Sequence, residues 1–387
     1  MVVTTMAHTL THTFVNTHLA LVPLFREEMG ISIELVGLMV SIPTLAQALL
    51  YLPFGMLSDR FQPHKLIATS LLLSSIGGLI IAQSWNAPML TLGFSVIAVC
   101  LAIFHPPAYS VISELFESKH RNFALGIHGA GGTLGMATGP ISVGLIMYIF
   151  GQGSWRWNYL LWSFPAFACF LMVIILKPGS FSSQQHSGKS EVPSGEPGLR
   201  EAFTKTYLLF LILVSFRNFG VQAASTYMTT FLKEVHGIPL DYASILFGSI
   251  SLMGILAAPI GGIVADKVGE RTVLFITYSG QAAALAGIVM SRSLLLLMLF
   301  VVIYGFTEFL AMAPMSSLVA QFTPRERRGI AYAAYFLPST LIGAAAPVVG
   351  AFIINRLGVT HVFMLSICLF LLAALVVRVI VRRSVSS

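Results

Sequence analysis

The sequence predicts an all-α membrane protein of twelve transmembrane helices in two six-helix bundles. Charged residues make up 10% of the 387-residue chain and hydrophobic residues 56%, whereas soluble domains carry about 25% charged residues. No soluble fold of this size could bury so much apolar surface, so the surrounding solvent must be lipid. The pattern G-x-x-x-D-[RK] occurs twice, in residues 55–60 and 262–267, at an interval of 207 residues (266 − 59 = 207). Pro140 and Pro347, each in a Gly-rich segment, keep the same interval, which indicates that one half repeats the other.

Twelve segments satisfy the requirement of about 20 mostly apolar residues for a membrane span. They are expected at 4–24, 34–57, 66–84, 88–112, 122–149, 157–176, 205–232, 241–264, 272–291, 293–320, 329–355 and 360–380. The longest polar stretch between spans is rich in Ser, Gly and Pro and is expected to be a flexible linker. The predicted domains are therefore an N-terminal bundle (1–178), a linker (179–203) and a C-terminal bundle (204–387).

The distribution of Lys and Arg predicts the orientation in the membrane. Sixteen cationic residues fall on the side of the linker and five on the opposite side, while Arg217 lies inside a span. Because cytoplasmic loops carry the excess of cations, the linker and both termini are expected in the cytoplasm. The membrane is expected to be the plasma membrane (a bacterial or archaeal inner membrane). The net charge is +7, but the sequence contains no basic stripe, phosphate loop, catalytic triad or metal-ligand spacing. We therefore expect a monomer that is not an enzyme and has no cofactor, metal or nucleic-acid partner.

Two loop motifs resemble those of the major facilitator superfamily of secondary transporters. They are GMLSDRFQPHK (residues 55–65), in which Gln62 replaces the usual turn glycine, and GIVADKVGER (262–271), which keeps Gly269. The resemblance covers essentially the whole chain. It implies two bundles that rock about a midplane site, with aspartates that gate the cytoplasmic side by meeting helix N-termini. The expected gating residues are Gly55, Asp59, Arg60, Glu114, Arg121, Gly262, Asp266, Lys267 and Arg271.

The fifth span, GIHGAGGTLGMATGPISVG (126–144), resembles the antiporter motif of proton-driven drug exporters. Gly126, Gly135, Gly139 and Pro140 are in register with that motif, and Gly144 is one residue late. Because glycines let helices approach closely, this helix is expected to slide against a partner across the bundle interface. Within the superfamily, HTLTHTFVNTHLALVP (8–23), FHPPAYSVISELF (104–116) and RNFALGIHGAGG (121–132) resemble the fosmidomycin-resistance group of exporters.

Two charged residues in the C-terminal half lie within membrane spans. Glu308 is a candidate proton carrier because intramembrane carboxyl groups are costly, tend to face a cavity and can exchange protons near neutral pH. Arg217 stays protonated and can bind a carboxylate or phosphate with two hydrogen bonds. With its neighbours Asn218 and Gln222, it is a candidate for substrate binding. The alternative is a structural ion pair between Arg217 and Glu308.

Histidines populate the N-terminal half. His8, His12 and Asn16 recur every four residues and therefore share one helix face, which is expected to line the cavity. His12 and His105 are candidates for proton coupling because histidine titrates near physiological pH. His8, Asn16 and His128 are candidates for substrate contacts. The alternative for His105 is a bond to carbonyl groups that the following prolines free.

Three tyrosines, Tyr304, Tyr332 and Tyr335, are candidates for an aromatic wall of the substrate site, although aromatics at helical spacing more often pack. Taken together, these residues predict a proton-coupled antiporter that exports a small amphiphilic or anionic organic compound by alternating access, with protons, substrate and the bilayer as its partners. One alternative is a proton symporter that imports an organic anion held by Arg217. Another is a membrane sensor that transports nothing.

Overall fold

The computed structural model describes residues 1–58, 61–116, 118–175, 205–321 and 328–380, and within them every regular element is a helix. Eleven described segments are long and apolar enough to cross a membrane. The predicted all-helical membrane fold is therefore confirmed, whereas the predicted count of twelve spans is not. The expected linker, residues 179–203, lies outside the described residues.

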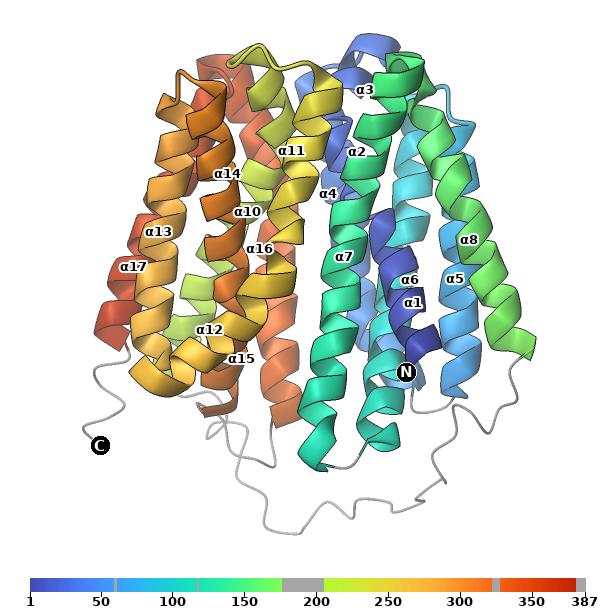
Figure 1. The fold of residues 1–387 in the computed structure, drawn as a ribbon, viewed down its shortest axis with the longest axis vertical. Coiled ribbons are helices and arrows are strands. Elements are labelled where there is room, and N and C mark those ends of the chain that lie inside the picture. Colours follow the sequence, from blue (N-terminus) through green and yellow to red (C-terminus); the bar gives the residue numbers. More distant parts are fainter. Residues whose placement is uncertain (59–60, 117, 176–204, 322–327, 381–387) are drawn as a thin grey trace.

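The helices fall into two bundles that stand side by side (Figure 1). The N-terminal bundle contains α1 (Val2–Thr13), α2 (Thr17–Ala20), α3 (Val22–Met29), α4 (Ile33–Ser58), α5 (Pro63–Ala82), α6 (Ala87–Leu115), α7 (Ser118–Phe150), the short η1 (Gln152–Ser154) and α8 (Trp155–Ile175). The C-terminal bundle contains α10 (Lys205–Glu234), α11 (Leu240–Leu252), α12 (Gly254–Val268), α13 (Glu270–Met290), α14 (Leu294–Leu310), α15 (Met312–Gln321), α16 (Arg328–Leu357) and α17 (Thr360–Ile380). We call the end at which α3 lies the upper end, and the end at which α1 begins and α8 finishes the lower end (Figure 1).

The first expected span, 4–24, is divided into α1, α2 and α3, and none of the three is long enough to be a span by itself. The three helices follow one another from the lower to the upper end (Figure 1). Pro23 has no backbone N–H to bond to the carbonyl of Leu19. That carbonyl instead accepts a hydrogen bond from the Thr229 hydroxyl of α10 at 3.1 Å. The irregular crossing is thus held against the opposite bundle.

Two spans of the C-terminal bundle are also interrupted. Residues 240–268 divide at Met253 into α11 and α12, and residues 294–318 divide at Ala311 between α14 and α15. Pro314 accounts for the second break, because its ring cannot accept the helical position of the Leu310 carbonyl and it donates no hydrogen bond. The Leu310 carbonyl occupies the space that a side chain on Gly261 of α12 would need.

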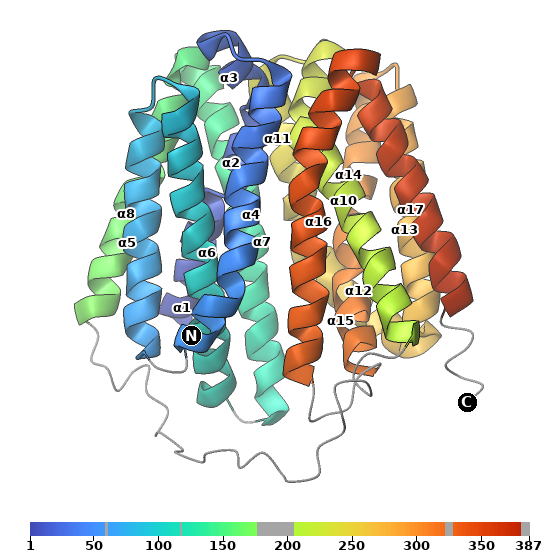
Figure 2. The same ribbon diagram turned by 180° about the vertical axis from the view of Figure 1, so that it is seen from behind.

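The bundles meet along two pairs of helices, α7 with α11 and α4 with α16 (Figures 1 and 2). Glycines make the contacts close. A Cβ atom on Gly248 of α11 would lie 2.6 Å from Cγ1 of Ile141 in α7, and one on Gly37 of α4 would lie 2.8 Å from the carbonyl oxygen of Pro347 in α16. Both distances are shorter than a side chain tolerates, so the two interfaces depend on backbone approach.

The apolar core is shared between the bundles only toward the upper end. One cluster of buried residues contains Phe25 and Trp155 of the N-terminal bundle together with Phe231 of the C-terminal bundle. Toward the lower end the core divides into two separate clusters. One includes Ala7 at the start of α1, and the other includes Tyr207 at the start of α10. Among the described residues, the buried apolar core is therefore shared between the bundles above and divided between them below.

The outward faces of the helices are apolar, as a bilayer requires. Phe164, Ile175 and Leu295 are each more than 70% exposed. Trp85, in the connection between α5 and α6, and Trp157, near the start of α8, are also highly exposed. Both lie toward the upper end, and tryptophan is enriched at membrane–water interfaces.

Candidate functional site

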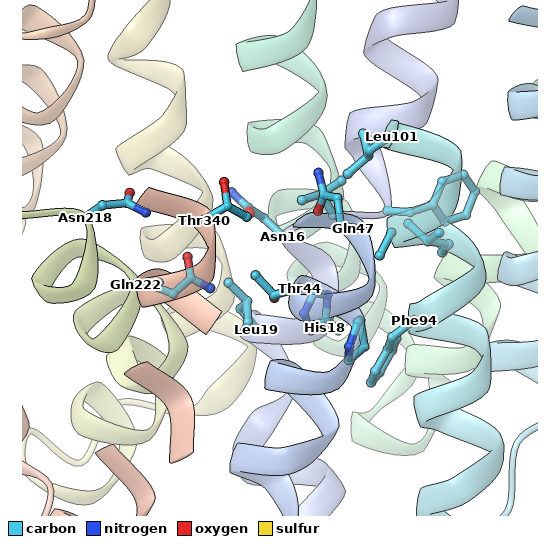
Figure 3. A pocket seen from close by; sticks show the side chains of 16 residues that line it. Asn16, His18, Leu19, Thr44, Gln47, Phe94, Leu101, Asn218, Gln222 and Thr340 are labelled. Atoms are coloured by element: carbon cyan, nitrogen blue, oxygen red, sulfur yellow. The ribbon is translucent and has the colours of Figure 1, made fainter. Parts of the chain in front are cut away.

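A cavity of about 250 Å³ lies between the two bundles. Most of its lining comes from the turn between α1 and α2 and from α2, α4 and α6, and the remainder comes from α10 and α16. The polar side chains that line it are Asn16, His18, Thr44, Gln47, Asn218, Gln222 and Thr340. Figure 3 shows Asn218, Gln222 and Thr340 on one side of the cavity and Asn16, Thr44 and Gln47 on the other.

Some of these polar groups are held by neighbours. Asn218 donates to the carbonyl oxygen of Ser339 at 2.9 Å, and Gln47 donates to the hydroxyl of Tyr51 at 2.8 Å. Asn16 donates across the bundle interface to the hydroxyl of Ser251 at 3.4 Å. The side chains of Asn218, Gln47 and Asn16, and that of Gln222, line the cavity, where a ligand could contact them.

The remaining wall is apolar or aromatic, and includes Phe14, Phe94 and Leu101. Among the described residues that line the cavity, none is Lys, Arg, Asp or Glu. His18 is the one titratable side chain in this lining, and its ring lies 4.7 Å from that of Phe94. Apolar walls with a few amide and hydroxyl groups suit a compact amphiphilic ligand.

Of the residues predicted from the sequence to bind substrate, Asn16, Asn218 and Gln222 line this cavity. Sequence reasoning missed Thr44, Gln47, Thr340 and His18. The four-residue spacing of His8, His12 and Asn16 does not include His18, but that spacing assumes one continuous helix, and α1 ends at Thr13 while α2 begins at Thr17. Pro23 predicts the break between α2 and α3 but not the earlier break between α1 and α2.

Four histidines that the sequence singled out form a cluster inside the N-terminal bundle. They are His8 and His12 of α1, His105 of α6 and His128 of α7. Nε2 of His12 lies 3.3 Å from Nε2 of His105. The ring of His8 stacks on that of His128 with 4.1 Å between centroids, and it meets the ring of His12 edge-on at 4.6 Å. None of the four belongs to the cavity lining, although His12 lies four residues before Asn16 and His105 lies one helical turn after Leu101.

Arg217 and Glu308 come together inside the C-terminal bundle. The Arg217 guanidinium donates to Oε1 of Gln281 at 3.2 Å and to the backbone carbonyl of Glu308 at 3.3 Å, and it faces the ring of Tyr278. Among the described residues, no ion pair joins the two side chains. Arg217 is 8% exposed and Glu308 is half-buried, and neither lines the cavity. Arg217 immediately precedes Asn218 of the cavity wall in the chain.

Polar contacts between the bundles close the upper end. Arg26 pairs with Glu234 at 3.2 Å, and Lys233 pairs with Glu27 at 2.5 Å. Asn355 of α16 donates to the carboxylate of Glu34 in α4. These contacts, which the sequence did not predict, lie beyond the shared apolar core and complete a barrier between the cavity and the upper end.

The predicted gating residues lie toward the lower end, and their role stays a prediction. Asp266 and Lys267 are exposed at the end of α12, and Arg271 donates to the backbone carbonyl of Arg378 within the same bundle. Gly55 lies in α4, and a Cβ atom on Gly262 would lie 3.5 Å from Ala313. Asp59 and Arg60 lie outside the described residues, as do the side chains of Glu114 and Arg121.

The glycines of α7 contact a different helix from the one expected. A Cβ atom on Gly135 or Gly139 would collide with the backbone carbonyl of Thr9 or Thr13, and both of these belong to α1 of the same bundle. The expectation that they face a partner across the bundle interface is therefore wrong. Gly144 supplies that contact, because a Cβ atom there would lie 2.7 Å from Ile245 of α11. Gly131, Gly132, Gly135 and Gly139 thus all face α1, whereas Gly144 faces α11.

Five further expected residues remain. Gly126 has open space around it, and Pro140 is accommodated within the continuous helix α7. Tyr304 is 1% exposed and packs near Phe370, away from the cavity lining. The side chains of Tyr332 and Tyr335 lie outside the described residues.

Comparison with known proteins agrees with this architecture. The sequence model of the family described as Major Facilitator Superfamily matches residues 4–337 and, in a second match, residues 234–387. The chain belongs to the Major Facilitator Superfamily. The resemblance predicted from the loop motifs is therefore confirmed, and membership in this superfamily indicates a transport protein and not an enzyme.

Relatives within the Major Facilitator Superfamily include exporters. The chain is 25% identical over 282 residues to the fosmidomycin resistance protein of Escherichia coli (strain K12), covering 72% of this chain and 67% of that protein. It is 28% identical over 261 residues to the nitrite extrusion protein of Bacillus subtilis (strain 168), covering 67% and 62%. A crystal structure of a bacterial homolog of the human lysosomal transporter Spinster, inward-facing and unoccupied, superposes with a TM-score of 0.80 at 18% identity, covering 98% of this chain and 96% of that one.

Proposed function

We propose that the protein is a secondary active transporter that exports a small amphiphilic organic compound in exchange for protons. The observation that carries this proposal is the cavity lined by both bundles, directly below the point at which their shared core ends. A site made from two bundles can be exposed to either side in turn when the bundles rock against each other. With the upper end closed and the linker in the cytoplasm, as the cation count predicts, this structure corresponds to the inward-facing state.

The lining of the cavity supports an amphiphilic substrate over an anionic one. Its volume of about 250 Å³ is slightly below that of most ligand sites, which are commonly about 300–1,000 Å³. The described lining offers amides, hydroxyls and apolar surface but no fixed cation. The rival hypothesis, a symporter that holds an organic anion on Arg217, would require this guanidinium to leave Gln281 and the Glu308 carbonyl. In this structure the Arg217 guanidinium is hydrogen-bonded to those two groups.

Glu308 is the best candidate for the coupling proton. A carboxyl group within a membrane span is energetically costly, and such groups are rare unless they serve a function. Arg217 contacts the Glu308 backbone and immediately precedes Asn218 of the cavity wall. A change in the charge of Glu308 can therefore shift Arg217 and, through α10, the cavity wall. His12 and His105 offer a second proton-binding pair in the other bundle.

Vesicles that contain the purified protein and a trapped pH indicator test this proposal. Compounds that the protein protects cells against are added, and the internal pH is followed. The unmodified protein should move protons against the direction of the compound. Glu308→Gln should abolish the proton movement while compound binding remains, whereas Asp241→Asn, at the start of α11 and far from Glu308, should leave both unchanged. Proton movement by Glu308→Gln at the rate of the unmodified protein would refute the role of this carboxyl.

The same experiment distinguishes the rivals. A symporter would move protons in the same direction as the compound. A sensor without transport activity would move neither, and neutral substitutions at Asp59 or Glu308 would not affect flux.

A further inference from the structure

Three histidines inside the N-terminal bundle are arranged as a set of metal ligands. One ring nitrogen from each of His8, His12 and His105 lies within 4.8 Å of the others. His8 and His12 occupy successive turns of α1, and His105 approaches them from α6. We propose that these three imidazoles form a binding site for a divalent transition-metal ion such as Zn²⁺, with water or a ligand in the fourth position.

The separation of two of the nitrogens already fits a tetrahedral ion. Zinc binds imidazole nitrogen at about 2.0–2.1 Å, so two such ligands at the tetrahedral angle lie about 3.3–3.4 Å apart. Nε2 of His12 and Nε2 of His105 lie 3.3 Å apart. Closing the site requires only that the third nitrogen, from His8, move inward by a small side-chain adjustment.

The hydrogen bonds of His8 and His105 to backbone carbonyls leave one nitrogen lone pair of each ring available for a metal ion. A carbonyl oxygen can only accept a hydrogen bond, so Nδ1 of His105, at 2.8 Å from the Leu101 carbonyl, must carry the proton. The same reasoning assigns the proton of His8 to Nδ1, which lies 2.7 Å from the carbonyl of His128. Nε2 of both neutral rings is therefore unprotonated. Metal-binding histidines ordinarily donate their other ring N–H to a carbonyl or carboxylate in this way.

Hydrogen bonds within the protein do not satisfy the cluster. Nδ1 of His12 and both ring nitrogens of His128 are buried and have no hydrogen-bond partner among the described residues. Buried polar groups without partners are costly and uncommon in folded proteins. An ion with its coordinated water would supply partners that the neighbouring side chains do not.

The ligand set selects the class of ion. Only imidazoles contribute to the described group, with no carboxylate or thiolate among them. Imidazole suits Zn²⁺, Cu²⁺ and Ni²⁺, whereas Mg²⁺ and Ca²⁺ prefer oxygen. Three neutral ligands leave the double charge of the ion uncompensated, which favours an anionic group in the fourth position.

The fold of α7 makes space for this arrangement. Gly132 lies against the His8 ring, and a Cβ atom at this position would stand 2.6 Å from its Cε1. Sequence analysis predicted no metal site, because α1 supplies only two ligands and the third, His105, is 93 residues from His12. The inference does not rest on the proposed function, since binding is measured on the protein without any transport.

Zinc titration of the purified full-length protein, with any affinity tag removed, tests the site. Calorimetry should show one Zn²⁺ bound per chain. His12→Ala and His105→Ala should each weaken that binding at least tenfold. The matched control is His361→Ala, an exposed histidine at the start of α17, which should bind as the unmodified protein does. Equal binding by His12→Ala and the unmodified protein would overturn the proposal, as would an equal loss in His361→Ala.

X-ray absorption of the zinc-loaded protein gives an answer that does not depend on loss of function. The unmodified protein should show nitrogen ligands at about 2.0–2.1 Å and no sulfur, and His12→Cys should add one sulfur at about 2.3 Å. A first shell without imidazole, or His12→Cys without a zinc–sulfur distance, would overturn the site. If no zinc binds, His12 and His105 share a proton and the metal proposal is wrong.

Discussion

Removal of the two interbundle ion pairs should weaken the barrier at the upper end by an amount that can be calculated. Two interbundle ion pairs, Arg26–Glu234 and Lys233–Glu27, join side chains that are 25–56% exposed. Exposed pairs contribute about 0.2–1 kcal/mol each, so loss of both costs about 0.4–2 kcal/mol. Because about 1.4 kcal/mol corresponds to a factor of ten, the population that is open at the upper end should rise about 2- to 30-fold. Glu27→Gln combined with Glu234→Gln removes both pairs without introducing repulsion.

The labelling rate of a cysteine in the cavity measures this population. Val15→Cys, in a background in which Cys100, Cys169 and Cys368 are replaced, places a thiol on the cavity wall. A membrane-impermeant thiol reagent added at the upper face should label the neutralised variant about 2- to 30-fold faster than its parent. High salt should narrow the difference, because it screens the pairs in the parent.

Two controls separate a barrier effect from a general loss of stability. Glu28→Gln removes the pair with Arg156, which lies at the same end but within one bundle, and should leave the labelling rate unchanged. The exchange Glu27→Lys with Lys233→Glu restores one pair in reverse and should return the rate toward that of the parent. If the neutralised variant labels no faster than the parent, or if Glu28→Gln has the same effect, the ion pairs do not close this end.

Two further predictions concern the cavity and the packing of α7. Asn16→Ala and Gln222→Ala should each weaken substrate binding about 2- to 13-fold, as loss of a hydrogen bond of about 0.5–1.5 kcal/mol implies. Thr91→Ala in α6, whose hydroxyl bonds only within its own helix, should bind as the unmodified protein does; unchanged affinity in both cavity variants would mean that substrate binds elsewhere. Gly139→Ala should lower the apparent melting temperature in detergent, because overpacking against Thr13 costs about 1–3 kcal/mol. Gly126→Ala, with open space around it, should keep or raise that temperature, and an equal fall in both variants would contradict the assigned contact with α1.

The helices were predictable because a span is a local property. Each needs only a sufficient run of apolar residues, and α5 or α13 can be recognised without knowledge of its neighbours. The first crossing departs from this rule because its regularity depends on more than length. Pro23 leaves the Leu19 carbonyl without its helical hydrogen bond, and the Thr229 hydroxyl of the other bundle donates one to it instead.

The site could be predicted only in part, for the same reason. Asn16, Asn218 and Gln222 were found because polar residues inside a span must face protein or water. The meeting of His12 with His105, the commitment of Arg217 to Gln281 and the pairing of Lys233 with Glu27 each join residues far apart in the chain. Such contacts follow from the packing of whole helices, and no spacing in the sequence encodes them.

Proton movement that opposes compound movement tests the central claim most directly. The unmodified protein is reconstituted in vesicles without a pH gradient, and a transported compound is added to one side. Exchange predicts that protons leave the compartment that the compound enters, so this compartment becomes more alkaline until the compound gradient is exhausted. Compound uptake with no pH change, or with protons entering alongside the compound, would contradict proton-coupled export.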